Sequence, residues 1–282
     1  MEGRILDGKA MSEVILGRLD GEVKSLRRKG IVPKLVVIQV GDDPASTIYV
    51  NKKHKACLRL GIESEIKHLP EETRYEDLID AIVKLNNDDS VHGILVQLPL
   101  PEHLSHKGVL EAVDPAKDVD GLNPYNHGKN LLGKECFQPA TPRGIISLIE
   151  STKTELEGIN AVVIGRSNIV GKPTAIMLLN RGCTVTVCHS KTRNLSDFTQ
   201  KADLLIVAAG KPGLVKAHMV KNGAIVIDVG INRLEGGKIV GDVDFDEVRK
   251  KAAWITPVPG GVGPMTIASL MENTIRACRE YA

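Results

Sequence analysis

The sequence predicts an α/β protein of two domains, each built around a largely parallel sheet. Short apolar runs alternate with longer helix-like segments along the chain, an alternation typical of βαβ units. A segment rich in Pro, Gly, Asn and Asp, residues 114–144, interrupts the alternation and marks a domain boundary or a functional loop. A length of 282 residues fits two domains or one large α/β domain, and the interruption favours two.

In the first half, three strand-like runs are separated by two helix-like segments. A helix with one polar face extends to about Lys29, and the strands that follow read KLVVIQV, ESEIKHL and GILVQLPLP. A helix of about four turns is expected between the first two strands. Ser46 in GDDPAST is its expected N-cap and Gly61 its expected end. Another helix is expected from Tyr75, between the second and third strands.

The second half contains a further βα series. Its strands read NAVVIG, TVTVC, LLIVAAG and AIVIDVG, with helices expected from about Lys172 and near Leu195. The last unit, ITPVPGGVGPMT, precedes a C-terminal helix. We therefore expect one domain from residues 1–138 together with 265–282, and a Rossmann-like domain from residues 139–264.

Composition limits the classes of partner. The net charge of +2 comes from 37 basic and 35 acidic residues that are interspersed, which does not favour a nucleic-acid footprint. No stretch approaches about 18 consecutive apolar residues, and the N-terminus lacks the pattern of an export signal. The five cysteines form no CxxC pair, so neither a zinc site nor a disulfide framework is indicated. We expect a soluble cytoplasmic protein with reduced thiols and with neither a nucleic-acid nor a membrane partner.

Lys53 has an unusual position in the helix that contains YVNKKHKA. At about 100° per residue, Tyr49, Ala56 and Leu60 cluster on one face, and Lys53 falls in the middle of it, whereas Lys55 lies outside. An ammonium on a core-facing stripe must reach water along its stem, pair with another group, lose its proton or line a cleft. The helix alone does not distinguish these possibilities.

The loop GRSNIVG connects a strand to a helix, where α/β nucleotide folds bind a pyrophosphate, although it is not GxGxxG. A purely structural turn is the alternative. After the next strand, where an NAD site usually carries Asp or Glu, the chain reads CHSKTRN. Ser190 and Arg193 there, together with Arg166 and Ser167, suit a ribose with a 2′-phosphate. NADP is therefore favoured over NAD, with a solvated basic loop as the alternative.

Three further stretches place polar or rigid groups where a ligand would bind. Gln97 interrupts an apolar strand at its C-terminal end, either as a ligand-facing carboxamide or as a hydrogen-bonded core residue. KDVDG, residues 117–121, carries two carboxylates, but no further ligands arrive at a useful spacing and we expect no metal. PVPGGVGPMT, residues 257–266, is a stiff loop that lets a flat ligand approach the backbone, or else an interdomain linker.

Taken together, YVNKKHKA, VQLPLP, KDVDG, GRSNIVGKP and PGGVGPMT resemble the bifunctional methylenetetrahydrofolate dehydrogenase and methenyltetrahydrofolate cyclohydrolase family. The resemblance follows the family's order from about Leu6 to the C-terminal helix. It implies NADP-dependent oxidation of 5,10-methylenetetrahydrofolate to the methenyl cation, and hydrolysis of that cation to 10-formyltetrahydrofolate, in a folate cleft between the domains. It also implies a homodimer joined through the nucleotide domain, acting in one-carbon metabolism and purine biosynthesis.

The resemblance assigns roles to single residues. In the catalytic set, the catalytic lysine falls on Lys53, its glutamine partner on Gln97, the aromatic stacking residue on Tyr49 and the pterin-recognising aspartate on Asp120. Tyr49 and Asp120 would bind the folate together with three residues of the PGGVGPMT loop, Pro259, Gly260 and Gly261. The residues that would bind the cofactor are Gly165, Arg166, Ser167, Ser190 and Ile231.

The chain departs from many relatives at residues 139–142, which read PATP where they read PCTP. Ala140 replaces a cysteine whose thiol is not assigned to catalysis. We therefore expect both activities. Two alternatives remain: a dehydrogenase that has lost the cyclohydrolase step, and a non-catalytic regulator that binds NADP or folate.

Overall fold

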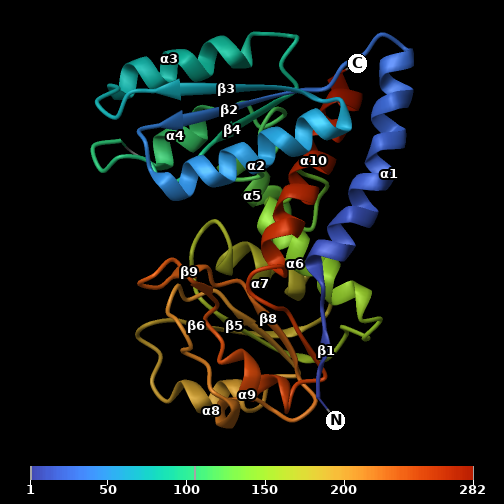
Figure 1. Ribbon diagram of the computed structural model, residues 1–282, viewed down its shortest axis with the longest axis vertical. Coiled ribbons are helices and arrows are strands. Elements are labelled where there is room, and N and C mark those ends of the chain that lie inside the picture. Colours follow the sequence, from blue (N-terminus) through green and yellow to red (C-terminus); the bar gives the residue numbers. More distant parts are fainter. Residues whose placement is uncertain (1, 105, 282) are drawn as a thin grey trace. The chain divides into compact units, whose positions relative to one another are not determined.

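Two α/β units make up the protein, as the alternation of strand-like and helix-like segments predicts. The structure is a computed structural model that describes residues 2–104 and 106–281 (Figure 1). One unit has a three-stranded sheet and comprises Val14–Lys129, Glu135–Ala140 and the residues from Ile267 onward. The other has a six-stranded sheet and comprises the residues through Glu13, Asn130–Lys134 and Thr141–Thr266. We call them the three-stranded unit and the six-stranded unit.

This division differs from the expected one chiefly at the N-terminus. The expected boundaries assign residues 1–138 to one domain, whereas the structure groups the residues through Glu13 with the six-stranded unit. The reason is β1 (Arg4–Ile5), which pairs in parallel with β11 (Trp254–Ile255). A strand of two residues has no periodicity from which this pairing could be predicted.

The three-stranded sheet is parallel, with strand order β3-β2-β4. Its strands confirm the three predicted runs and are β2 (Lys34–Val40), β3 (Glu63–Leu69) and β4 (Gly93–Val96). Successive side chains of β2 point to opposite faces, and both faces are buried. Leu35 and Val37 belong to one apolar cluster, and Val36 and Ile38 belong to another.

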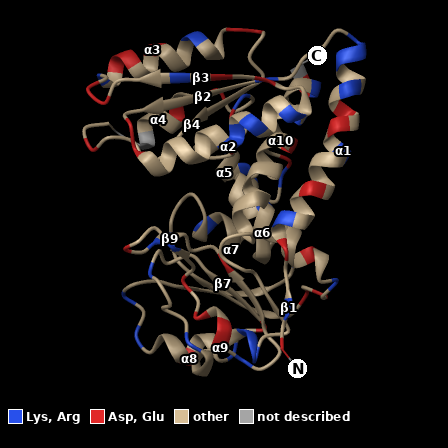
Figure 2. Ribbon diagram, in the orientation of Figure 1, with Lys and Arg blue, Asp and Glu red and all other residues tan. Residues whose placement is uncertain are grey.

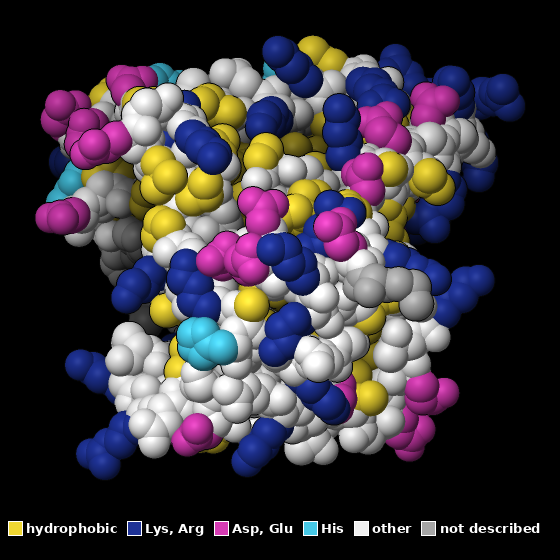
Figure 3. Space-filling view, turned by 60° about the horizontal axis from the view of Figure 1, so that its bottom comes forward, with side chains coloured by type: hydrophobic (Ala, Val, Ile, Leu, Met, Phe, Trp, Pro, Cys, Tyr) yellow, Lys and Arg dark blue, Asp and Glu magenta, His cyan; other side chains and the backbone are white. Residues whose placement is uncertain are grey.

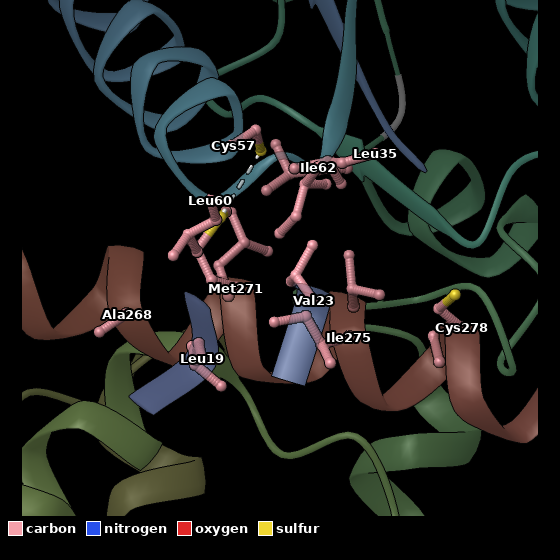
Figure 4. Packing of buried hydrophobic residues seen from close by; sticks show 14 of the residues in the cluster. Leu19, Val23, Leu35, Cys57, Leu60, Ile62, Ala268, Met271, Ile275 and Cys278 are labelled. Carbon is pink, nitrogen blue, oxygen red and sulfur yellow. Dashed lines mark hydrogen bonds between the residues drawn. The ribbon is translucent and has the colours of Figure 1, made fainter. Parts of the chain in front are cut away.

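Helices cover both faces of this sheet. On the face of Val36, the cluster includes residues of α3 (Tyr75–Asn86) and α4 (His106–Ala112). On the face of Leu35, it includes residues of three helices, α1 (Gly8–Arg28), α2 (Pro44–Leu60) and α10 (Val262–Tyr281). In Figure 4, Cys57 and Leu60 of α2 lie near Met271 of α10, and the two sulfur atoms of Cys57 and Met271 are 3.5 Å apart.

The segment 114–144 is not wholly irregular. It contains α5 (Pro124–Leu131) and the first turn of α6 (Ala140–Ser151). Gly128 and Gly133 interrupt the apolar positions around α5, which explains why the sequence did not predict a helix there.

The six-stranded sheet is also parallel, with strand order β1-β11-β8-β7-β5-β6. Four strands confirm the predicted runs: β5 (Asn160–Ile164), β6 (Thr184–Cys188), β7 (Leu204–Val207) and β8 (Ile225–Asp228). The helical segments that follow β5 and precede β11 are α7 (Gly171–Leu179), α8 (Leu195–Thr199), the 3₁₀ helix Ala217–Met219 and α9 (Phe245–Arg249). The sequence did not predict the short antiparallel pair β9 (Asn232–Arg233) and β10 (Ile239–Val240).

Charged side chains of both signs are interspersed, as the composition predicts. Figure 2 shows basic and acidic residues together on α1 and α3, and Figure 3 shows both signs scattered over the face that it presents. The charged residues of α2 are all basic. No helix in the described part of the chain has the length and apolar character that a membrane-spanning segment requires.

The start of α2 corrects one expectation. Asp43, rather than Ser46, is the N-cap: its carboxylate accepts from the backbone N–H of Ser46 at 2.7 Å, and Pro44 occupies the first turn. Ser46 is buried inside that turn, and its hydroxyl has no hydrogen-bond partner among the described residues. The other end is as predicted, since Gly61 adopts φ 74° and caps the helix.

A pair of variants tests this cap assignment. Asp43→Ala should lower the free energy of unfolding by about 1 kcal/mol, because the side-chain acceptor of the first turn is lost. Ser46→Ala should leave it unchanged or raise it, because no hydrogen bond is broken. Urea unfolding of both variants and the parent measures the difference. A larger loss for Ser46→Ala than for Asp43→Ala would restore Ser46 as the cap.

Candidate active site

The buried face of α2 contains one charged residue, Lys53. The buried residues of this helix recur at helical spacing and are Ser46, Val50, Lys53, Cys57 and Leu60. Lys53 is 7% exposed, whereas its neighbours Lys52 and Lys55 are exposed. The prediction that Lys53 lies on the core-facing stripe is confirmed.

The Lys53 amine has a neutral hydrogen-bond partner. Its Nζ donates to Oε1 of Gln97 at 2.9 Å. Gln97 directly follows β4, and its backbone N–H donates to the carbonyl of Ile38 at 2.8 Å. Its Nε2 donates to the carbonyl of Leu98 at 2.6 Å, which turns the carboxamide oxygen toward the lysine. The carboxamide therefore orients the amine without adding a negative charge.

Asp120 is the carboxylate whose charge acts on this amine. Burial lowers the pKa of Lys53, and the charge of Asp120 raises it to a smaller extent. Burial in turn raises the pKa of Asp120, while Lys53 lowers it. Within the described residues no group donates a hydrogen bond to the Asp120 carboxylate. Its oxygens are therefore available as acceptors for a ligand.

Tyr49 lies one helical turn before Lys53 and is half-buried. Burial raises the pKa of its hydroxyl. The ammonium of Lys52 lies 5.5 Å from the centroid of the ring, a cation–π contact on the exposed side of the helix. The ring is thus held on the same helix as Lys53, with part of its surface accessible.

The two carboxylates of KDVDG have different environments. Asp118 is buried and accepts from the backbone N–H groups of Leu122 at 3.1 Å and Asn123 at 2.8 Å, and from Nδ2 of Asn126 at 2.8 Å. Burial raises the pKa of Asp118 to about 6. Asp118 therefore holds the loop in shape, which leaves Asp120 as the carboxylate for a ligand. Residues 2–104 and 106–281 contain no cluster of three or more potential metal ligands.

Asn273 is a site residue that the sequence did not reveal. It is fully buried in α10, and its Nδ2 donates to the carbonyls of Val119 at 2.9 Å and Gln138 at 3.0 Å. It thereby fixes the backbone next to Asp120. An amide among the apolar residues of a C-terminal helix was the available signal, of the same kind that identified Lys53.

In the six-stranded unit, the register brings together the two loops that suit a nucleotide. Ile164 of β5 pairs with Cys188 of β6, and the backbone N–H of Gly165 donates to the carbonyl of Cys188 at 2.8 Å. The loop with Arg166 and the loop with Ser190 therefore leave the same edge of the sheet on neighbouring strands. That edge is where α/β sheets bind their ligands.

Two glycines make a close turn in the first of these loops. Gly165 has φ 124°, and a Cβ there would lie 2.3 Å from the carbonyl oxygen of Ala208. A Cβ on Gly171, at the start of α7, would lie 2.2 Å from the carbonyl oxygen of Gly165. These two glycines permit a close approach of the backbone, which is the role of glycines in a GxGxxG loop, at a different spacing.

The predicted cofactor residues of this unit have different surroundings. The hydroxyl of Ser167 accepts from the backbone N–H groups of Val170 at 3.1 Å and Gly171 at 3.2 Å, so it already satisfies the start of α7. Arg166 and Ser190 are exposed and make no hydrogen bond with the described residues through their side chains. Ile231 follows β8 and is 49% exposed.

The segment PGGVGPMT follows β11 in the same unit, and it corrects an expectation: the predicted loop over residues 257–266 ends at Gly261, because α10 already begins at Val262. The carbonyl of Gly260 accepts from the backbone N–H of Lys9 at 2.9 Å, and a Cβ on Gly8 would lie 1.8 Å from the carbonyl oxygen of Gly261. Gly261 is buried, whereas Pro259 is exposed. The start of α1 therefore holds this loop in place, and only glycine at position 8 permits the approach.

Both units have polar groups at the carboxyl ends of parallel strands, one set around a buried lysine and the other suited to a nucleotide. The fold and these groups define a nucleotide-dependent α/β enzyme. Comparison with known proteins identifies the family. The chain belongs to the tetrahydrofolate dehydrogenase/cyclohydrolase family, because the model of its catalytic domain matches residues 6–120 and that of its NAD(P)-binding domain matches residues 139–282.

Relatives share almost the whole length of the chain. A bifunctional protein FolD of Campylobacter jejuni is 57% identical over 276 residues, which cover 98% of each chain. A crystal structure of the Campylobacter jejuni bifunctional enzyme FolD, a methylenetetrahydrofolate dehydrogenase/cyclohydrolase, has a TM-score of 0.97 at 55% identity and 99% coverage of both chains. The Trypanosoma brucei methylenetetrahydrofolate dehydrogenase-cyclohydrolase, solved with NADP cofactor and inhibitor, has a TM-score of 0.96 at 38% identity, covering 99% of this chain and 98% of its own.

Proposed function

We propose that this protein oxidises 5,10-methylenetetrahydrofolate with NADP⁺ and hydrolyses the resulting methenyl cation to 10-formyltetrahydrofolate. The observation that carries the proposal is the buried Lys53 amine, held by the Gln97 carboxamide with Asp120 near it. A bifunctional enzyme of this family needs such a group for the hydrolytic step. The six-stranded unit would bind the cofactor, and the three-stranded unit would supply Lys53, Gln97, Asp120 and Tyr49.

Folate binding would use the two groups that have accessible surface. The pterin and aminobenzoyl rings are flat, so they can stack on Tyr49. The pterin amino and ring N–H groups are donors, and the Asp120 carboxylate accepts no hydrogen bond from the described residues. The expected folate contacts of Pro259, Gly260 and Gly261, and the expected folate cleft between the domains, stay predictions.

Few side chains need to take part in the chemistry of the dehydrogenase step. When bound, NADP⁺ accepts the hydride from the methylene carbon of the substrate, and the cofactor carries the difficult chemistry. The protein would contribute alignment of the reacting carbons and exclusion of water. Removal of Lys53 should therefore affect this step less than hydrolysis.

Hydrolysis requires proton transfer. Water attack on the methenyl carbon forms a C–O bond and releases a proton, and cleavage of the bond to the ring nitrogen requires a proton on that nitrogen. Burial lowers the pKa of Lys53, so its amine can take up and return a proton nearer to neutral pH. Gln97 would orient the amine, whereas a carboxylate in its place would hold the amine protonated.

The cofactor residues fit NADP. Gly165 and Gly171 allow a close approach of a pyrophosphate to the backbone, and Arg166 and Ser190 offer unpaired donors on adjoining loops. The loop after β6 has no carboxylate. A carboxylate at that position would repel a 2′-phosphate. Ile231 supplies exposed apolar surface at the end of β8.

We further propose a cytoplasmic homodimer that supplies one-carbon units to purine biosynthesis, because its formyl product is a one-carbon donor. The five cysteines are buried and free, which suits a reducing compartment. The homodimer is carried over from the family resemblance. A dehydrogenase without hydrolysis, or a non-catalytic regulator, is less well supported because Lys53, Gln97 and Asp120 are all present.

A dual assay on the purified protein separates these functions. Formation of NADPH from methylenetetrahydrofolate reports oxidation, and decay of methenyltetrahydrofolate absorbance reports hydrolysis. Both signals are expected. Absence of NADPH formation would refute the enzyme, and oxidation without hydrolysis would identify the dehydrogenase alternative.

Lys53→Met should abolish cyclohydrolase activity while at least part of the dehydrogenase activity remains, because only hydrolysis needs the amine for proton transfer. Lys55→Met is the matched control, since Lys55 is exposed on the same helix and both activities should survive. Decay of methenyl absorbance above the uncatalysed rate measures the effect. Unchanged hydrolysis by Lys53→Met would contradict the assignment.

Ser190→Asp should weaken the preference for NADP over NAD, because the new carboxylate repels the 2′-phosphate. Thr184→Asp adds the same charge at the opposite, exposed end of β6 and should leave the preference unchanged. The ratio of kcat/KM for the two cofactors is the measured quantity. Equal use of NAD and NADP by the parent protein would count against the cofactor assignment.

A further inference from the structure

A buried carboxylate lies beneath the loop that follows β7. Asp242 is fully buried. Its Oδ2 accepts from the backbone N–H groups of Ala209 at 2.7 Å and Gly210 at 2.8 Å, and its Oδ1 accepts from that of Lys211 at 2.8 Å. Three consecutive backbone N–H groups thus converge on one carboxylate, an arrangement that binds anions in many proteins. Here the protein supplies the anion itself.

The same carboxylate also holds the loop that follows β8. Oδ1 of Asp242 accepts from Nδ2 of Asn232 at 2.8 Å, and Asn232 adjoins Ile231. Residues 209–212 and Ile231 are exposed, so these loops are tied from the buried side. One side chain therefore fixes two exposed loops at the carboxyl edge of neighbouring strands.

A second buried carboxylate orients the first. Asp228, the last residue of β8, accepts from the backbone N–H groups of Gly230, Asp242 and Val243, each at 2.9 Å. Asp228 is 3% exposed. The backbone on both sides of the β8 loop is thereby fixed, and Asp242 is held under the β7 loop.

Two glycines make room for these carboxylates. A Cβ on Gly230 would lie 2.3 Å from the carboxyl carbon of Asp242. A Cβ on Gly241 would lie 1.8 Å from Oδ2 of Asp228. The stretch IDVGIN, in which the family resemblance gives a role to Ile231 alone, and the stretch GDVDF therefore form one structure.

These loops adjoin the pyrophosphate loop. β7 lies between β5 and β8, and the close approach of Gly165 to Ala208 joins the loop after β5 to the start of the loop after β7. A change in the shape of residues 209–211 would therefore reach the position where the cofactor is expected. Loops that are ordered before binding lower the entropic cost of binding.

We propose that Asp242, oriented by Asp228, is a positioning residue for the nicotinamide cofactor: it fixes the loops after β7 and β8 in the shape that binds NADP⁺. The proposal rests on the proposed function of this protein. Asp242 would not touch the cofactor, and its effect would pass through residues 209–211 and Ile231.

Asp242→Asn in the full chain tests the proposal. The amide replaces one acceptor oxygen with a donor, so two of the four donors around it lose their acceptor. The KM for NADP⁺ should rise roughly tenfold, as expected when buried donors are left unpaired. kcat at saturating NADP⁺ and the rate of methenyltetrahydrofolate hydrolysis without NADP⁺ should stay within about twofold. Asp246→Asn removes an exposed carboxylate four residues on and serves as the matched control.

The KM and kcat separate positioning from a loss of folded protein. Unfolding of the six-stranded unit would lower kcat and leave KM unchanged, which would overturn the proposal. An unchanged or lower KM for NADP⁺ would also overturn it. If Asp242→Asn does not fold, Asn232→Ala is the second variant, because it removes only one of the donors to Asp242. A raised KM for NADP⁺ with retained hydrolysis then supports the proposal. An unchanged KM for NADP⁺ overturns it. Failure of the proposed function itself is distinguishable, because the parent would then form no NADPH.

Discussion

The burial of the Lys53 amine against a neutral acceptor is the interaction on which the proposed chemistry of this protein depends. An ammonium without water is costly, and a carboxylate partner would keep it protonated. Gln97 provides a hydrogen bond of 2.9 Å without the charge. The charge of Asp120 stabilises the ammonium by less than burial destabilises it, so the pKa of Lys53 stays below its ordinary value.

That arrangement requires three separate elements to meet. α2 supplies Lys53, the end of β4 supplies Gln97, and the loop held by Asp118 supplies Asp120. The apolar cluster around Leu35 fixes α2 against the sheet, and Asn273 fixes the backbone beside Asp120. A buried carboxylate plays a similar part in the six-stranded unit, where Asp242 holds a loop through its backbone N–H groups as Asp118 does. In both units, one acidic residue shapes a loop that carries or adjoins groups proposed to bind a ligand.

Much of this could be predicted from the sequence, because the signals are local. Helical periodicity placed Lys53 on the buried face of α2, and the strand-like runs matched the strands of both sheets. The N-cap of α2 was predicted wrongly because only Ser46 was considered, whereas Asp43, three positions earlier and directly before Pro44, accepts the hydrogen bond of the first turn. Residue types alone could not separate Asp118 from Asp120, since they differ in the donors that the folded loop brings to Asp118, and only the family resemblance distinguished Asp120. Likewise, Ala209 and Asp242 are 33 residues apart in the chain, and only the folded structure brings them together.

The titration of the Lys53 amine tests the central claim most directly. In protein labelled with ¹³Cε lysine, the Lys53 signal is identified by its absence from Lys53→Met and followed by NMR as the pH is raised. Burial predicts a midpoint below the ordinary value of 10.5. The unfolded chain then binds this proton more tightly than the folded one, so the contribution of Lys53 to the free energy of unfolding rises with pH between the two pKa values. A midpoint at or above 10.5 would contradict the account, because the amine would then be held as an ammonium throughout the reaction.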